Sequence, residues 1–143
     1  GIQIQPVIVQ RPEELETAYA TMARERAEAL IVLPDLMFDQ HRQRLIELAS
    51  AHRLPAMYYG LPWVEAGGLM FYGVSYAEMF RRAAHLADRI LKGASPAELP
   101  IEQPPHFELH INLKTAQDLG LKIPLRFRWG DPVLPPEEMM KLS

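Results

Sequence analysis

The sequence predicts an α/β fold in which a mostly parallel sheet is flanked by helices. Short apolar segments with strand character alternate along the chain with longer amphipathic segments. Such alternation favours parallel strands joined by right-handed crossovers. In addition, residues 29–33 (ALIVL) are apolar without interruption. A run of this kind is typical of a strand buried on both faces, as the strands of parallel sheets are.

Size and composition indicate one globular domain. The chain has 143 residues, 48% of them hydrophobic and 23% charged, which suffices for a substantial core. The net charge of −3 argues against non-specific binding to nucleic acid or to anionic membranes. The absence of cysteine excludes disulfides, thiol catalysis and cysteine zinc sites. No apolar run approaches the ~20 residues of a membrane span, and no signal sequence is visible in this chain.

Local patterns place the individual elements. Residues 2–9 alternate apolar and polar positions, which predicts a strand. Residues 12–27 predict a helix, because Pro12 suits its first turn and apolar residues recur every three or four positions. The same reasoning predicts strands at 29–33, 55–59, 69–72 and 107–111, and helices at 38–52, 76–92 and 113–119.

Capping residues and loops complete this prediction. Asp39 is expected to cap the helix at 38–52, Asn112 the helix at 113–119, and Ser75 with Glu78 forms an S-x-x-E capping box. Residues 61–68 are expected to form an exposed loop, and residues 124–143 an extended tail.

Polar and aromatic residues follow three of the predicted strands. They are Asp35, then Tyr59 and Gly60, then Tyr72 and Ser75. Ligands of open parallel sheets bind outside the carboxyl ends of the strands, so we expect these residues to converge on a ligand. Asp35 would hold an ammonium or a hydroxyl group. The free N–H groups at the helix start at Ser75 would receive a carboxylate.

The loop between two of these strands adds Trp63 and Glu65 to the candidate ligand site. Tyr59, Trp63 and Tyr72 would stack on a ring or a cation, and Glu65 would accept from a donor.

Structural roles are alternatives for most of these residues. Asp35 and Ser75 can act as helix caps only, and Trp63 can pack on a neighbouring lobe. Gly67 and Gly68 more often mark a tight turn than a phosphate cradle. Because neighbouring strand residues point to opposite faces, only one of Tyr58 and Tyr59 can reach a crevice.

No catalytic, cofactor or metal site is predicted. The sequence contains no G-x-S-x-G, G-x-G-x-x-G, Walker or H-E-x-x-H motif. His106 and His110 are four residues apart, which on a strand is roughly 13 Å and too far for one zinc ion.

Longer phrases of the sequence resemble a known family. They are ALIVLPD, HRLPAMYYG, VEAGGLMFYG, ILKGASPAELPIEQP and FELHINLKTAQDLGL, in this order. Over residues 1–124 the chain resembles the ABC-transporter substrate-binding proteins of the type I periplasmic class, in the branch that includes tryptophan/tyrosine-type proteins.

This resemblance implies two α/β lobes with a small molecule between them. The chain would be a fragment, about the second half of such a protein, without the first lobe and without the opening strand and helix of the second. Residues 1–75 would belong to the C-terminal lobe, and 76–93 would be a helix that packs with the N-terminal lobe or a partner chain. Residues 94–123 would form the crossover, returning strand and short helix. The family's functional positions fall near Asp35, Tyr59, Gly60 and Tyr72, with the Trp63–Glu65 loop at the cleft mouth.

The function implied is that of the solute-binding component of an ABC importer, not of an enzyme. The protein would bind an amino acid or a related metabolite, deliver it to ABC permease subunits, and work in the periplasm or elsewhere outside the cytoplasm. One alternative is a flavodoxin-like enzyme domain with Asp35 or Glu65 as base. The other is an assembly fragment that forms a homodimer through its exposed lobe surface or a swapped helix 76–92.

Overall fold

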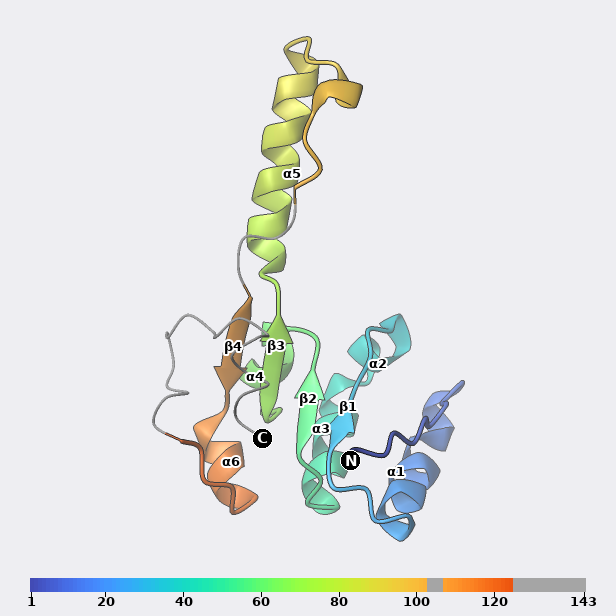
Figure 1. The fold of residues 1–143 in the computed structure, drawn as a ribbon. Coiled ribbons are helices and arrows are strands. Elements are labelled where there is room, and N and C mark those ends of the chain that lie inside the picture. Colours follow the sequence, from blue (N-terminus) through green and yellow to red (C-terminus); the bar gives the residue numbers. More distant parts are fainter. Residues whose placement is uncertain (103–106, 125–143) are drawn as a thin grey trace.

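One four-stranded sheet organises the protein. The computed structural model describes residues 1–102 and 107–124, and the strand order is β1-β2-β3-β4. Strands β1, β2 and β3 are parallel, and β4 is antiparallel to β3, so the predicted α/β fold with a mostly parallel sheet is confirmed (Figure 1). The strands are β1 (Leu30–Ile31), β2 (Ala56–Tyr58), β3 (Met70–Gly73) and β4 (Glu108–Ile111).

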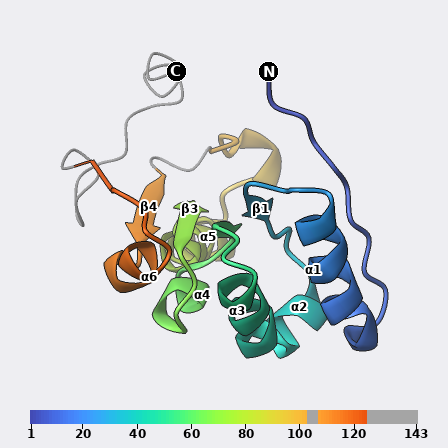
Figure 2. The same ribbon diagram turned by 90° about the horizontal axis from the view of Figure 1, so that it is seen from below.

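The helices are arranged asymmetrically around this sheet. Figure 2 shows α3, α4 and α6 on the same face, while α5 projects away from the sheet beyond the carboxyl end of β3 (Figure 1). The helical elements are η1 (Pro12–Glu14), α1 (Leu15–Arg24), α2 (Leu36–Gln40), α3 (Arg42–Ala51), α4 (Leu61–Glu65), α5 (Tyr76–Leu91), η2 (Pro96–Glu98) and α6 (Leu113–Asp118).

The hydrophobic core lies between the sheet and its helices. Tyr58 of β2 and Phe71 of β3 are register partners and point to the helix-covered face, where both are buried. Tyr19 of α1 is also buried, and its hydroxyl donates a hydrogen bond to the carbonyl oxygen of Leu45 at 3.0 Å. This bond ties α1 to α3 inside the core.

The opposite face of the sheet has an apolar row without a described helix over it. Ile31, Met57, Met70 and Ile111 are successive register partners across the four strands. Ile31 is 62% exposed and the other three are half-buried. The prediction that residues 29–33 are buried on both faces is therefore wrong, because no described segment packs over this side.

The predicted strand at residues 2–9 is also wrong. Residues 1–10 have no regular structure, and Ile2, Ile4 and Ile8 are exposed. A strand requires hydrogen-bonding partners along its backbone, and no described strand pairs with this segment. Alternation of apolar residues alone does not supply such a partner.

The predicted helix at 38–52 is two helices. α2 and α3 are separated by His41, and the cap of α2 is Asp35 rather than Asp39. Asp35 Oδ1 accepts a hydrogen bond from the backbone N–H of Met37 at 2.8 Å. Asp35 therefore acts as a helix cap, which was the alternative to ligand binding for this residue.

The segment predicted as an exposed loop forms the short helix α4. Its Trp63 and Val64 are buried, because both side chains turn toward the core. Helices α5 and α6 confirm the predictions at 76–92 and 113–119. Asn112 caps α6 as expected, whereas the Ser75 side chain makes no capping hydrogen bond. The tail predicted at 124–143 lies, from residue 125 on, outside the described residues.

A close backbone approach at Gly68 gives a test of this packing. A Cβ atom at this position would lie 2.7 Å from the carbonyl oxygen of Trp63 and 2.7 Å from the Tyr58 ring. We expect Gly68→Ala to lower the free energy of unfolding by about 2 kcal/mol, as measured by urea denaturation. At Gly60 the nearest atom would be 3.5 Å away, so Gly60→Ala is the matched control with a smaller effect. Equal losses in both variants would contradict this packing.

Candidate ligand-binding site

The carboxyl ends of β1 and β2 are joined by a direct hydrogen bond. The Tyr59 hydroxyl, just after β2, donates to the carbonyl oxygen of Asp35, after β1, at 3.2 Å. The Asp35 carboxylate is exposed apart from its capping bond to α2. Gly60 follows Tyr59 and caps α4 with its backbone, and its carbonyl oxygen accepts from the Trp63 N–H at 3.2 Å. The structure therefore brings Asp35, Tyr59 and Gly60 together.

The Tyr59 hydroxyl is held in its neutral form. Burial, and then the nearby Asp39 carboxylate, raise the pKa of Tyr59 to about 12. The hydroxyl is therefore a hydrogen-bonding group, not a base, throughout the neutral range. Because Tyr59 is only half-buried, a small molecule at the strand ends has access to it.

Trp63 lies in the core behind this cluster. Its side chain is 1% exposed and its ring stacks on Tyr58 with centroids 4.7 Å apart. The Arg42 guanidinium lies 5.5 Å from the centroid of the Trp63 ring, and the Tyr59 ring packs against it edge-on at 5.3 Å. In this arrangement the indole has no free face for a ligand. The predicted stacking of Trp63 on a ligand would require this side chain to leave the core, and it stays a prediction.

Among residues 1–102 and 107–124, two polar atoms at this ring are buried without a hydrogen bond. They are Trp63 Nε1 and Arg42 Nε. The indole N–H lies near enough to the Tyr59 hydroxyl to oppose its raised pKa, but makes no well-formed hydrogen bond. Arg42 retains one long ion pair, with its guanidinium 3.4 Å from Asp39 Oδ1.

The remaining predicted residues occupy two other places. Tyr72 of β3 is half-buried and its ring stacks on Phe107 at 5.6 Å. Ser75 begins α5, and its carbonyl oxygen accepts from the Met79 N–H. Glu65 lies apart from the strand ends, at the end of α4, where it lines a groove on the helix-covered face.

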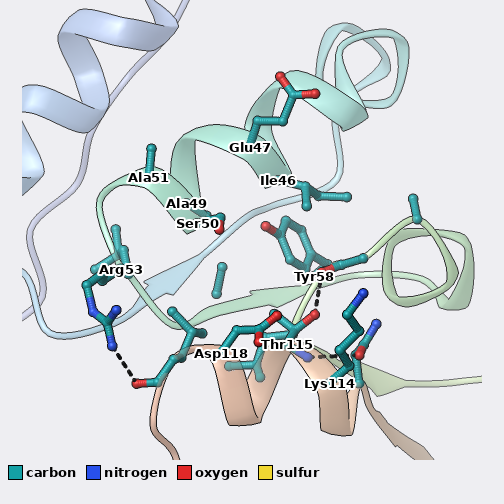
Figure 3. A pocket seen from close by; sticks show the side chains of 18 of the residues that line it. Ile46, Glu47, Ala49, Ser50, Ala51, Arg53, Tyr58, Lys114, Thr115 and Asp118 are labelled. Atoms are coloured by element: carbon teal, nitrogen blue, oxygen red, sulfur yellow. Dashed lines mark hydrogen bonds between the residues drawn. The ribbon is translucent and has the colours of Figure 1, made fainter.

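This groove has a volume of about 690 Å³ and lies between α3, the end of α4 and α6 (Figure 3). Its floor contains buried apolar residues and its rim carries charges of both signs. The lining includes Ser50, Arg53, Leu54, Ala56, Tyr58, Glu65, Gly67, Gly68, Leu69, Lys114, Thr115 and Asp118. Of the residues predicted to bind a ligand, only Glu65 contributes to it.

Sequence reasoning missed three contributors to the strand-end cluster. Arg42 resembles a solvated residue in the sequence, and Asp39 resembles a cap, because the helix break at His41 has no local signal. Phe107 was assigned only to a strand. Its stacking on Tyr72 depends on antiparallel pairing of β4 with β3, which no local pattern indicates.

Neither a metal cluster nor a membrane span is found in the described residues. No three side chains of His, Asp or Glu among residues 1–102 and 107–124 are placed to hold a metal ion. Within the same ranges, no helix combines the length and the apolar character that crossing a membrane requires.

Comparisons with known proteins give a consistent result. A family model described as ABC transporter substrate binding protein matches residues 1–127. No curated protein matches the chain. Among solved structures, a conserved domain protein from Vibrio cholerae is similar with a TM-score of 0.67 and 24% identity, over 79% of this chain and 38% of that one.

Two further solved structures are similar. One is an L-Trp complex of an ABC domain from Streptococcus pneumonia, with a TM-score of 0.66 and 24% identity, over 78% of this chain and 38% of that one. The other is the ligand-free, open form of a substrate-binding protein with adhesive properties from Clostridium difficile, with a TM-score of 0.65 and 18% identity, over 83% and 40%. The chain thus spans less than half the length of these structures, and the likeness shows a shared fold.

The environment of Tyr59 predicts a pH effect. Its pKa is raised to about 12, so the folded state holds the phenolic proton more tightly than the unfolded chain, where tyrosine titrates near ~10. This contribution to stability is complete below pH ~10 and is lost as the pH rises through about 12. We expect the free energy of unfolding to fall more steeply with pH in the wild type than in Tyr59→Phe.

Urea denaturation at a series of alkaline pH values measures this difference. Burial also raises the pKa of Tyr19 and Tyr58, but those residues are present in both proteins and their effect cancels. Identical pH slopes in the two proteins would show that the Tyr59 hydroxyl is not held as described.

Proposed function

The chain belongs to the ABC transporter substrate-binding protein family, and from this premise we propose that it binds a small solute at the carboxyl ends of β1, β2 and β3. The single observation that carries this proposal is the hydrogen bond from Tyr59 to the Asp35 carbonyl. It joins groups from two adjacent parallel strands at the sheet edge where ligands of open α/β sheets bind.

The chemistry at this edge suits a small molecule with a ring and polar groups. The exposed Asp35 carboxylate can accept from an ammonium or a hydroxyl group, and the neutral Tyr59 hydroxyl can also hydrogen-bond. The stacked pair of Tyr72 and Phe107 offers aromatic surface after β3. An amino acid or a related metabolite has these features, and the Streptococcus pneumonia domain was solved with L-Trp.

The whole protein would act as a receptor without bond chemistry. We propose that this lobe closes on the solute together with a first lobe, by hinge motion, and delivers the solute to ABC permease subunits outside the cytoplasm. The apolar side of α5 supports a second lobe, because Phe80 and Leu91 are 73% and 87% exposed and suit packing against another body. No described contact favours the enzyme alternative, since the Asp35 carboxylate already caps α2.

Titration of the isotope-labelled 143-residue chain with L-tryptophan, L-tyrosine and L-leucine tests the proposal by NMR. We expect amide shifts at Asp35, Tyr59 and Gly60 in a saturable titration, with weak affinity because one lobe supplies only part of the contacts. Tyr72→Ala should weaken binding of the aromatic amino acids by about tenfold through the lost stacking surface.

Phe80→Ala is the matched control, since Phe80 is an exposed aromatic residue of α5. Its affinity should equal that of the wild type. Absence of any saturable shift at the strand ends, or an equal loss in both variants, would overturn the proposed site.

Self-association through α5 is a second candidate property, favoured by the exposure of its apolar stripe. Tyr76, Phe80, Ala83, Ala87 and Leu91 recur at helical spacing, and all five are exposed. In the isolated chain we propose that a second copy covers this stripe, as a homodimer.

Native mass spectrometry and sedimentation test the homodimer. We expect the wild type to dimerise with increasing concentration, and a variant with Phe80→Asp and Leu91→Asp to stay monomeric with the same helix content. His85→Asp is the control, because His85 lies with Arg82 and Arg89 on the polar side of α5. A monomeric wild type, or a double variant that still dimerises, would contradict this proposal.

A further inference from the structure

The groove on the helix-covered face exists because α4 is short. The connection from β2 to β3 is residues 59–69, and only the five residues of α4 within it are helical. A crossover between parallel strands usually takes a dozen or more residues, most often with a longer helix. α4 therefore leaves the start of β2 and β3 without a helix above it, between α3 and α6. The hollow of about 690 Å³ that results is of the size that holds small molecules.

Three hydrogen bonds fix the shape of this hollow. Thr115 Oγ1 donates to the carbonyl oxygen of Gly67 at 2.9 Å, and Asn112 Nδ2 donates to that of Val64 at 3.2 Å. They hold α6 to α4 and to the turn that follows it. At the lower end, the Arg53 guanidinium donates to the carbonyl oxygen of Leu119 at 3.4 Å. The walls of the hollow are thus tied together before any ligand arrives.

The Tyr58 side chain is buried in this hollow, and among the described residues its hydroxyl makes no hydrogen bond. Tyr58 is 2% exposed and lines the hollow, and Figure 3 shows its ring between α3 and α6. Among the described residues its hydroxyl makes no hydrogen bond, in contrast to the equally buried Tyr19, which donates to Leu45. Unlike Trp63 Nε1 and Arg42 Nε, this hydroxyl is not fully enclosed, so an occupant of the hollow with a polar atom at this depth can form a hydrogen bond with it.

The rim carries charges of both signs that have no partner among the described residues. Lys114 and Asp118 lie on α6, and Glu65 lies at the end of α4. None of the three has an ion pair or a hydrogen bond within the described part of the chain. Below them the floor is apolar, with Ala56 and Leu69 both buried. This surface complements a molecule with an apolar body and both a positive and a negative group.

We propose that this groove is a second small-molecule site, for a small zwitterion with an apolar body, such as a free α-amino acid. Lys114 meets the carboxylate, Glu65 and Asp118 meet the ammonium, and the apolar body covers Ala56 and the Tyr58 ring. The site is separate from the one at the carboxyl ends of the strands, because it opens at the start of β2, where Arg53 and Leu54 line it.

L-Phenylalanine is the probe that tests this site. Titrated into the labelled 143-residue chain, it should shift the amides of Glu65, Gly68, Thr115 and Asp118 with one saturable affinity. Phenethylamine and 3-phenylpropionate each lack one of the two charges, and we expect both to bind these residues roughly tenfold more weakly. Equal binding of all three probes would overturn the zwitterion assignment.

Variants locate the site. Lys114→Ala should weaken L-phenylalanine binding by roughly fivefold. Ser50→Trp should abolish it by filling the hollow from α3, where Ser50 is exposed. Lys122→Ala and Thr17→Trp are the matched controls at exposed positions outside the groove and should bind as the wild type does.

The groove proposal and the strand-end proposal can be refuted independently of each other. Tyr59→Phe should leave the groove shifts unchanged, whereas a loss of those shifts in Tyr59→Phe would place the ligand at the strand ends and overturn the groove proposal. Absence of shifts at Glu65 and Thr115 in the wild type would overturn it as well. Shifts confined to the groove would support this site while contradicting the proposed function at Asp35 and Tyr59.

Discussion

Burial of Trp63 is the constraint on which the arrangement of this protein depends. Its ring is enclosed by Tyr58 of β2 on one side and by Arg42 of α3 on the other, so one side chain connects the sheet, α3 and α4. Gly68 must lack a side chain because the Tyr58 ring and the Trp63 carbonyl oxygen occupy the space of a Cβ atom. The same cluster sets the position of Tyr59, whose ring packs on the edge of the indole while its hydroxyl reaches Asp35. The core and the candidate ligand site are therefore one continuous unit of packing.

This unit explains why the two proposed sites lie at opposite ends of the same strands. Trp63 stacks on Tyr58 directly after Gly60, so α4 lies on the helix-covered face of the sheet, in contact with β3 and β4. Above it, Asp35 and Tyr59 remain accessible. Toward the start of β2, the short α4 does not extend over the sheet, which leaves the groove between α3 and α6. The short helix separates two regions of different chemistry, one with a carboxylate and a neutral hydroxyl group, the other with an apolar floor and mixed charges.

The sequence predicts those features that depend on local pattern or on general topology. The helices α5 and α6 follow from apolar spacing, and the convergence of Asp35 and Tyr59 follows from the rule that parallel strands end at one edge. Features that depend on distant partners were not predictable in this way. Residues 2–9 have the alternation of a strand but no paired neighbour, and the burial of Trp63 requires Arg42, which is 21 positions away and follows a helix break without a local signal. Propensity decides whether a segment can form a strand or a helix, and tertiary contacts decide whether it does.

The long connection between β3 and β4 affects the order in which the sheet can form during synthesis. The chain leaves the sheet at Gly73, runs out along α5, and returns to pair with β3 only at Glu108. Until the ribosome has released that returning segment, β3 is an edge strand with its outer hydrogen-bonding groups unpaired. Closing such a long loop is slow compared with forming α3 or α5, which need only local contacts. A nascent chain that pairs β1, β2 and β3 before this segment is available exposes the outer edge of β3, and exposed edges of this kind favour wrong pairing.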